Sequence, residues 1–210
     1  YEIHWRDWSS DVCSSDLLKK LEYRGYDSAG IAGIHGDCIG YCKVVGNIDA
    51  LAQELNGSEL NLDTAIAQTR WATHGKPSIE NAHPHFDNEE TLAVVHNGII
   101  ENHEALRHML KEKGFIFQSE TDSEVIAHLI AYFYEGDILR AVQQALPLLQ
   151  GAFALAIIHK QFPGQIIAVA SESPLAVGIG AGEAFIASDS LALRTVAKEV
   201  IYLADCEVAV

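Results

Sequence analysis

The chain has 210 residues, which is enough for one large domain or two small ones with a substantial core. Its 14 basic and 29 acidic residues give a formal net charge of −15 that is spread along the sequence, so neither nucleic acid nor an anionic membrane is an expected partner. There is no apolar run of about 18 residues and no basic-then-apolar start, so neither a membrane span nor a secretory signal is expected.

The four cysteines, Cys13, Cys38, Cys42 and Cys206, lack the paired C-x-x-C spacing of a metal site. Reduced thiols in a cytoplasmic protein are therefore a better interpretation than a disulfide or a metal centre. Cys38, Cys42 and Cys206 fall on predicted strands or strand ends, and we expect them to be buried structural thiols.

Residues 1–16 differ in composition and periodicity from the rest of the chain. They carry two of the three tryptophans and a near-repeat of Ser-Ser-Asp, without sustained helical or strand periodicity. We expect this segment not to be part of the fold. Leu17–Glu22 then has the pattern of the end of an amphipathic helix, and a polar turn over 23–30 leads into a short apolar strand at Ile31–Ile34.

A hairpin follows, with its turn at His35-Gly36-Asp37 and its return strand at Cys38–Val45. Asn47 is in position to cap a helix through Ile48–Leu55. A strand near Thr64–Gln68 then brings Arg70 to its end.

The middle of the chain alternates polar segments with apolar periodic ones. The segment 76–85 is too polar and too interrupted by proline for regular structure, so it predicts a loop over a pocket. A strand is predicted at Thr91–Val95, a helix at Ile99–Lys113 and a short strand at Phe115–Phe117. Ser119–Glu124 has the composition of a helix N-terminus, and an amphipathic helix follows it.

Asp137 begins a further predicted helix that extends towards Gly151. After it the chain consists of predicted strands that are apolar at nearly every residue, as in strands covered on both faces. These strands are Ala152–His159, Gln165–Ser171, Leu175–Ile179, Ala184–Ala187 and Glu199–Leu203. Sheets in the middle with helices outside suggest stacked layers, and the lack of an internal repeat or linker favours one domain.

Two polar blocks at the ends of predicted strands carry the candidate chemistry. They are Gln68–Gly75 and Val94–Gly98. Arg70 offers a planar fork for a carboxylate, and Trp71 offers a rigid wall beside it. The Asn97 amide and the Gly98 backbone N–H are the kinds of donor that form an oxyanion hole. A surface ion pair and a type I′ hairpin turn are the respective alternatives.

A metal site built from histidines is a third interpretation. The candidates are His74, His83, His85 and His96. No compact pair of them lies on a predicted helix. We therefore expect no metal and no other cofactor.

From about Leu18 to its end, the chain resembles the glutaminase domain of the glutamine–fructose-6-phosphate aminotransferases, which are class 2 glutamine amidotransferases. The resemblance covers most of the chain, and its motifs occur in the family's order. They are Leu21–Gly30, Thr69–Gly75, Asn81–His85, His96–Asn102, Ser119–Glu124 and Phe185–Asp189.

This resemblance implies an α+β fold of the N-terminal-nucleophile hydrolase type, a four-layer α/β/β/α sandwich. It also implies hydrolysis of L-glutamine to glutamate and ammonia, the ammonia being used to make glucosamine-6-phosphate from fructose-6-phosphate. In that family two sugar-isomerase domains follow the glutaminase domain and bind the sugar phosphate. The full-length protein is expected to be a homodimer.

The resemblance also assigns roles to residues. Arg70 binds the α-carboxylate of glutamine, Asp122 holds its α-ammonium group, and Asn97 forms the oxyanion hole with the backbone of Gly98. The other implied pocket residues are Trp71, Thr73 and His74, whose backbone groups line it, and His83, on the loop that folds over it. A zwitterionic amino acid needs one cation, one anion and a site for developing charge, and Arg70, Asp122 and the Asn97-Gly98 pair supply one each.

The sequence departs from that family at its N-terminus. The family's nucleophile is an N-terminal cysteine followed by Gly and an apolar strand, and the free α-amine of that cysteine is the general base. Here residue 1 is Tyr1, and Cys13 has an amide nitrogen and too few residues before Leu21 for a strand and a helix. We therefore interpret residues 1–16 as a foreign segment. Residues 17–210 are then the amidotransferase domain without its N-terminal strand and without the sugar-isomerase domains.

On this interpretation the chain as written lacks the nucleophile, binds glutamine poorly and does not hydrolyse it. One alternative is a non-catalytic glutamine-binding module that keeps Arg70, Asp122 and Asn97. The other is the glutaminase domain of amidophosphoribosyltransferase. Tyr23–Gly30 fits the aminotransferase better than it fits the His-Arg-Gly-Gln-Asp-Ala-Ala-Gly block of that sibling family.

Overall fold

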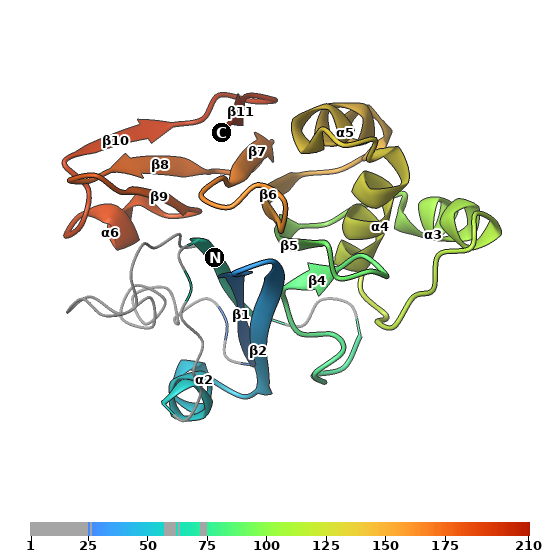
Figure 1. Ribbon diagram of the computed structural model, residues 1–210, viewed down its shortest axis with the longest axis horizontal. Coiled ribbons are helices and arrows are strands. Elements are labelled where there is room, and N and C mark those ends of the chain that lie inside the picture. Colours follow the sequence, from blue (N-terminus) through green and yellow to red (C-terminus); the bar gives the residue numbers. More distant parts are fainter. Residues whose placement is uncertain (1–24, 26, 57–61, 63, 72–74) are drawn as a thin grey trace.

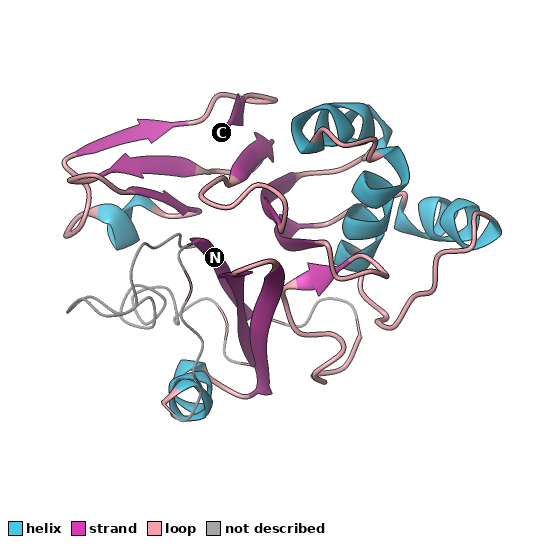
Figure 2. Ribbon diagram, in the orientation of Figure 1, coloured by secondary structure: helices cyan, strands magenta, loops and turns pink. Residues whose placement is uncertain are grey.

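The computed structural model describes residues 25, 27–56, 62, 64–71 and 75–210 (Figures 1 and 2). The expectations for residues 1–16, for the helix end at 17–22 and for the pocket residues Thr73 and His74 lie outside this part. Within it, no helix is long and apolar enough to cross a bilayer.

A three-stranded antiparallel sheet begins the described fold. β1 (Ser28–His35) and β2 (Cys38–Val45) form the predicted hairpin, and Gly36 in its turn adopts a left-handed φ of 58°. β3 (Thr64–Arg70) pairs with the other side of β1. β1 begins before the predicted start at Ile31, because its ladders to both neighbours already begin at its first residue.

The other strands form two further antiparallel sheets. The larger sheet contains, in spatial order, β11 (Val208–Ala209), β7 (Ile167–Ser171), β6 (Phe153–His159), β5 (Leu92–Gly98) and β4 (His85–Phe86). The smaller one contains β10 (Glu199–Tyr202), β8 (Ala176–Ile179) and β9 (Ala184–Ala187). The predicted strands of the last third are all present. β10 is mostly exposed, contrary to expectation, because it lies at the edge of its sheet.

Helices cover the outer faces of these sheets (Figure 1). The helices α3 (His103–Glu112), α4 (Ser123–Phe133), α5 (Ile138–Ala145) and the 3₁₀ turn η2 (Leu146–Leu148) lie on the side of the five-stranded sheet, and α2 (Ile48–Leu55) and α6 (Ser190–Leu193) lie on the side of the other two. Two predicted caps form, since the side chain of Asn47 accepts a hydrogen bond from Ala50 N at 3.2 Å and that of Asp137 from Arg140 N at 3.0 Å.

Alternation along the central strands divides the interior into layers. Leu92 and Val94 of β5 point into a core shared with α3, α4 and α5, whereas Ala93 and Val95 point into a core shared with β1 and β3. A further core lies between β1, β3, β8 and β9 on one side and α2 and α6 on the other. The layer order is helix, sheet, sheet, helix, which confirms the predicted sandwich. The second sheet layer consists of two separate three-stranded sheets.

The predicted strand at Phe115–Phe117 is wrong. The backbone of Ile116 bonds to the side chain of Asn88 instead of to a neighbouring strand: Ile116 N donates to Asn88 Oδ1 at 2.9 Å, and Asn88 Nδ2 donates to Ile116 O at 2.7 Å. The helix expected from Ile99 begins only at His103, because Ile100 N donates to the carboxylate of Asp122.

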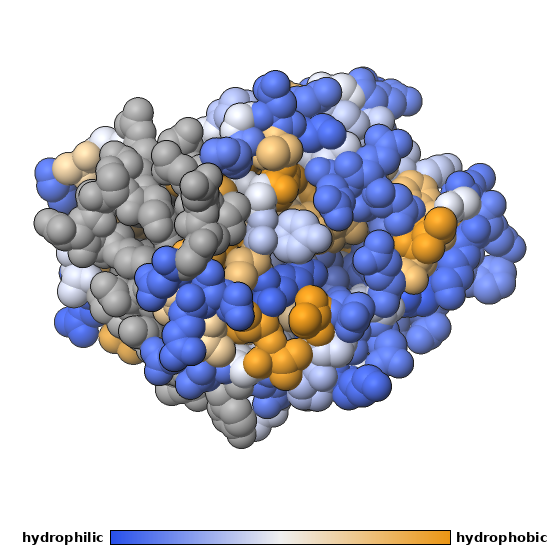
Figure 3. Space-filling view, turned by 60° about the horizontal axis from the view of Figure 1, so that its bottom comes forward, coloured by the Kyte–Doolittle hydropathy of each residue, from blue (hydrophilic) through white to orange (hydrophobic). Residues whose placement is uncertain are grey.

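The expectation of buried thiols is also wrong. Cys38 and Cys206 are exposed, Cys42 is half-buried, and all three are free. Cys38 follows the hairpin turn, and Cys206 lies in a turn before β11 with a φ of 60°, so both are loop-side positions. The described residues on the face shown in Figure 3 are mostly polar, with apolar residues in small patches.

Candidate active site

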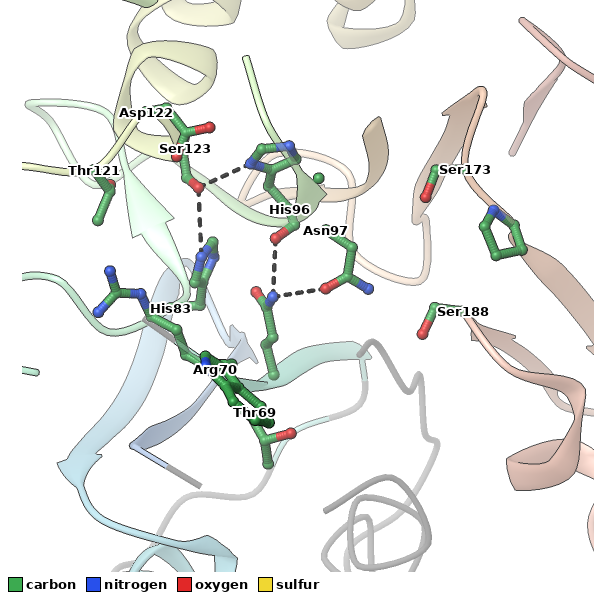
Figure 4. A pocket seen from close by; sticks show the side chains of 14 residues that line it. Thr69, Arg70, His83, His96, Asn97, Thr121, Asp122, Ser123, Ser173 and Ser188 are labelled. Atoms are coloured by element: carbon green, nitrogen blue, oxygen red, sulfur yellow. Dashed lines mark hydrogen bonds between the residues drawn. The ribbon is translucent and has the colours of Figure 1, made fainter. Parts of the chain in front are cut away.

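The candidate site lies at one end of the space between the two sheet layers. On β3, Ile66 points into the core between the layers, so Gln68 and Arg70 point to the same side by strand alternation. On β5, Val95 points into that core, and Asn97 therefore points the same way. These ends border a cavity of about 250 Å³ (Figure 4). Its lining residues are Gln68, Thr69, Arg70, Trp71, His83, His96, Asn97, Gly98, Thr121, Asp122, Ser123, Ser173, Pro174 and Ser188.

Arg70 is the last residue of β3 and is buried, with 6% of its surface exposed. Its Nη2 donates a hydrogen bond to Gly75 O at 3.3 Å. Burial lowers the pKa of the guanidinium, while the negative charges of Asp27 and Asp122 raise it. Arginine remains protonated under such shifts, so the cavity contains a fixed cation. Trp71 lies beside it and is 59% exposed, so it borders the open side of the site.

Asp122 supplies the negative charge of the cavity. It occupies the position before α4, where the sequence predicts a helix cap, but its side chain does not cap that helix. Instead its Oδ2 accepts a hydrogen bond from Ile100 N at 2.8 Å, and only 4% of the residue is exposed. One carboxylate oxygen is thus anchored on the segment after β5, and the charge lies against the cavity near the positive N-terminus of α4.

The loop before α4 is fixed by buried hydrogen bonds. Glu124 accepts from Gln118 N at 2.7 Å, from Ser119 N at 2.7 Å and from Ser119 Oγ at 2.6 Å. Burial raises the pKa of Glu124, but hydrogen bonds from His128 and from this loop outweigh it and bring the pKa to about 2. Arg107 donates to the carbonyl oxygens of Ser119 and Thr121. Asp122 therefore extends from a rigid support.

Asn81 joins this loop to the predicted loop 76–85. Its Nδ2 donates to Lys76 O at 2.9 Å, and its Oδ1 accepts from Glu120 N at 2.9 Å. Gly75 has a φ of 72°, and a Cβ on it would lie 2.7 Å from Asn81 Nδ2. A glycine is required there by both conformation and space. This link holds the segment at Gly75, whose carbonyl oxygen accepts the hydrogen bond from Arg70, against the loop that carries Asp122.

Asn97 and Gly98 are the last two residues of β5, so the alternative of a type I′ turn is wrong. Gly98 has a φ of 132°, and a Cβ on it would lie 2.0 Å from Ala152 O. Only glycine permits this approach of two backbones. Gln68 Nε2 donates to both Asn97 Oδ1 and His96 O, each at 2.8 Å. The predicted pair of oxyanion donors therefore lies at the cavity, with the side chain of Asn97 held by β3.

His83 and His96 are buried and line the same cavity as Arg70 and Asp122. Ser123 Oγ lies 2.9 Å from His96 Nδ1 and 3.4 Å from His83 Nε2. Burial lowers the pKa of His96 to about 4, against the attraction of Asp122, and burial lowers the pKa of His83 well below its usual value, assisted by His85. Both imidazoles are therefore neutral at pH 7. Among the described residues no cluster of three or more His, Cys, Asp or Glu could hold a metal ion.

The structure brings together the site residues expected from sequence that it describes, namely Arg70, Trp71, His83, Asn97, Gly98 and Asp122. The other residues that line the cavity had no substrate-binding role assigned from sequence, although Gln68, Thr69 and His96 lie within the two candidate blocks. They are Gln68, Thr69, His96, Thr121, Ser123, Ser173, Pro174 and Ser188. The place of Gln68 in the site could have been predicted from the sequence, because Gln68 precedes Arg70 by two positions on a strand and therefore lies on the same face. Ser173 comes from a distant part of the chain, and no local pattern marks it. Ser188 lies in the Phe185–Asp189 motif, to which no role was assigned from sequence.

The three described cysteines, Cys38, Cys42 and Cys206, do not line this cavity. The described residues thus provide a cation, an anion and amide donors around one small space, which is the set needed to hold a zwitterionic amino acid with its side-chain carbonyl near the donors.

The glutamine amidotransferase domain model matches residues 69–195. The chain is 51% identical over 197 residues to the glutamine–fructose-6-phosphate aminotransferase [isomerizing] of Thermotoga maritima, covering 92% of this chain and 32% of that protein. It is 53% identical over 189 residues to the protein of the same name from Legionella pneumophila strain Paris, covering 89% and 31% respectively. The chain thus spans about a third of the length of these curated relatives.

Solved structures agree with the layered fold. Glutamine phosphoribosylpyrophosphate amidotransferase from B. subtilis, complexed with ADP and GMP, superposes with a TM-score of 0.76 at 28% identity, over 96% of this chain and 44% of that one. A structure described as the allosteric regulatory enzyme of purine biosynthesis gives a TM-score of 0.81 with the same identity and coverage. The chain has the N-terminal-nucleophile type of fold and belongs to the glutamine amidotransferase domain family.

Proposed function

We propose that this domain binds L-glutamine and is the glutamine-hydrolysing part of a longer glutamine–fructose-6-phosphate aminotransferase. The observation that carries the proposal is the convergence of Arg70, Asp122 and Asn97 on one cavity of about 250 Å³. That volume is at the small end of ligand pockets and suits a single amino acid. Arg70 binds the α-carboxylate, Asp122 the α-ammonium group, and Asn97 with Gly98 N–H the side-chain carbonyl oxygen.

In the proposed reaction a thiolate attacks the carboxamide carbon of glutamine. The carbonyl oxygen becomes an oxyanion held by Asn97 and Gly98, the proton removed from the thiol passes to the amide nitrogen, and the C–N bond breaks to release ammonia and leave a γ-glutamyl thioester. Water then cleaves the C–S bond, which gives glutamate and returns the thiol. The described cysteines lie away from the cavity, so the proposal requires a thiol from another segment. Thr73 and His74 stay proposed as further lining residues, on the resemblance alone.

The second sheet layer supports a place for such a segment. Among the strands that the structure describes, β3 is at the edge of one three-stranded sheet and β9 at the edge of the other, although all seven residues of β3 are buried. A buried edge leaves backbone groups in need of partners. Both strands end at the cavity, since Arg70, the last residue of β3, and Ser188, the residue after β9, line it. We propose that one more strand lies between these edges and carries the nucleophile, and that residues 1–16 are foreign to the domain.

The proposed longer protein is a homodimer whose further domains bind fructose-6-phosphate and receive the ammonia. The sequence similarity favours this assignment over amidophosphoribosyltransferase, since the aminotransferase from Legionella pneumophila is 53% identical to this chain and the phosphoribosylpyrophosphate amidotransferase from B. subtilis is 28% identical. A second candidate function is a glutamine-binding module without catalysis, which the position of the described cysteines outside the cavity favours for this chain.

Calorimetric titration with L-glutamine, D-glutamine and L-asparagine, together with an ammonia-release assay, tests both candidates. We expect selective binding of L-glutamine without ammonia release by this chain. Failure to bind L-glutamine more tightly than its enantiomer would refute the site assignment. Ammonia release that Cys13→Ala abolishes would contradict the inactivity and place the nucleophile within residues 1–16.

A further inference from the structure

The cavity contains a buried amide that the proposed chemistry does not use. Gln68 is only 5% exposed, and its Nε2 lies 2.8 Å from His96 O and 2.8 Å from Asn97 Oδ1 (Figure 4). Gln68 belongs to β3 and Asn97 to β5, which are strands of different sheets in different layers. The contact is therefore a side-chain bridge across the sandwich, and no backbone ladder supplies it.

The two hydrogen bonds fix the orientation of both amides. His96 O is a backbone carbonyl and can only accept, so the atom of Gln68 that faces it is the NH₂ group. An NH₂ group has two hydrogens, and the second one points to Asn97, whose facing atom must then be its acceptor, Oδ1. The donor end of Asn97, Nδ2, is consequently turned away from Gln68. Figure 4 shows it pointing into the site on the side of Ser173 and Ser188.

The orientation decides whether Asn97 can stabilise negative charge. A side-chain amide presents a donor at one end and an acceptor at the other, and only the donor end stabilises an oxyanion or a substrate carbonyl oxygen. If the amide turned over, Oδ1 would face the same oxygen and repel it. An amide group does not by itself favour either orientation, and the fixed carbonyl of His96 favours one of them through Gln68.

We propose that Gln68 is a positioning residue that holds the Asn97 amide with its donor towards the carbonyl oxygen of the ligand. This inference rests on the proposed function, in which that ligand is L-glutamine. Gln68 acts only through Asn97. Because it shares a face of β3 with Arg70, one strand both orients the oxyanion donor and binds the α-carboxylate.

The test compares two ligands and three variants. L-Glutamine and L-norleucine share the α-groups and the chain length, but L-norleucine lacks the side-chain carbonyl oxygen. Gln68→Glu cannot donate to His96 O and accepts from Asn97, so it favours the reversed orientation of the Asn97 amide. Gln68→Met keeps the length of the side chain but removes both hydrogen bonds that Gln68 Nε2 donates. Gln53→Glu, on the exposed face of α2, is the control for the same change of charge.

We expect Gln68→Glu to weaken L-glutamine binding about tenfold, which corresponds to loss of one neutral hydrogen bond, and to leave L-norleucine binding unchanged. Gln68→Met should give a smaller loss of the same selectivity, and Gln53→Glu none. In an Asn97→Ala background, Gln68→Glu should cause no further selective loss. An equal loss for both ligands, or no loss, overturns the positioning role.

A second measurement needs no ligand. The thermal stabilities of Gln68→Met, Asn97→Ala and the double variant form a cycle with the unaltered chain, and we expect non-additive losses because the two side chains share a hydrogen bond. Additive losses overturn the pairing. If the unaltered chain binds neither amino acid, the proposed function fails, while this cycle still decides whether Gln68 holds Asn97.

Discussion

Replacing Asp122 by Asn removes the negative charge of the cavity while keeping the size of the side chain. The amide oxygen can still accept the hydrogen bond that Ile100 N donates to Asp122 at 2.8 Å, so the anchor of the residue is retained. What is lost is the attraction between the carboxylate and the α-ammonium group of the proposed ligand. The change therefore isolates one electrostatic contact.

The magnitude follows from the burial of the site. Asp122 is 4% exposed and the neighbouring cation Arg70 is 6% exposed, so solvent screens the contact weakly. Opposite unit charges about 4 Å apart attract by roughly 4 kcal/mol at an effective dielectric constant of about 20. Desolvation of the incoming ammonium group offsets part of this, and charge-assisted hydrogen bonds contribute about 1.5 to 3 kcal/mol net. A net loss of about 2 kcal/mol corresponds to L-glutamine binding that is weaker by about 30-fold.

Titration with L-glutamine and with its 2-oxo analogue, which lacks the ammonium group, measures this effect. Asp122→Asn should weaken the first ligand and spare or strengthen the second. Asp37→Asn, at the exposed hairpin turn, changes the net charge equally and should alter neither affinity. Equal weakening of both ligands by Asp122→Asn would show that the carboxylate supports the fold and does not contact the α-ammonium group.

Two further predictions concern stability. Gly98→Ala should destabilise the domain by about 2 kcal/mol or more, because it adds a Cβ that would clash with Ala152 O at 2.0 Å, at a φ of 132°. Thermal unfolding measures this loss. The control is Gly164→Ala, at a left-handed glycine whose added Cβ would meet open space, and it should lose less stability. The second concerns pH. Burial lowers the folded-state pKa of His96 to about 4, so the unfolded chain, with a histidine pKa of about 6.5, binds the proton more tightly. The contribution of His96 to stability should therefore rise by about 3 kcal/mol between pH 4 and 6.5, which urea unfolding measures. His96→Gln should flatten the rise of stability with pH more than His108→Gln, which removes an exposed imidazole, and equal slopes in both variants would contradict the assignment.

The sequence allowed prediction of those parts of the site that depend on local order. Arg70 and Asn97 each follow an apolar strand, and polar residues at strand ends are visible in a single chain. The hairpin and the Asn47 cap are similarly local, and both formed as predicted. Asp122 was placed in the site by the resemblance. The composition of the segment Ser119–Glu124 alone indicates a helix cap, and the side chain of Asp122 does not form one.

Contacts between distant segments were beyond prediction. The extended appearance of Phe115–Phe117 gave no sign that Asn88 bonds the backbone of Ile116 in place of a strand. The same holds for Gln68, whose identity was visible but whose partner Asn97 lies on a strand of another sheet. Local pattern gives the face of a strand on which a residue lies, whereas the layer opposite that face is set by the packing of the whole chain.

The packing between the sheets explains why a side-chain bridge can hold this site. The residues of β5, β6 and β7 that point towards the second sheet layer include many alanines, whereas those pointing towards the helices are mostly larger. Small side chains let the two layers approach closely. At the cavity end of this narrow core, Gln68 on one layer then reaches the backbone and side chain of the other at 2.8 Å. The alanine pattern of the core and the orientation of the Asn97 amide are thus parts of one arrangement, because a wider separation of the layers would break the bridge while leaving both sheets intact.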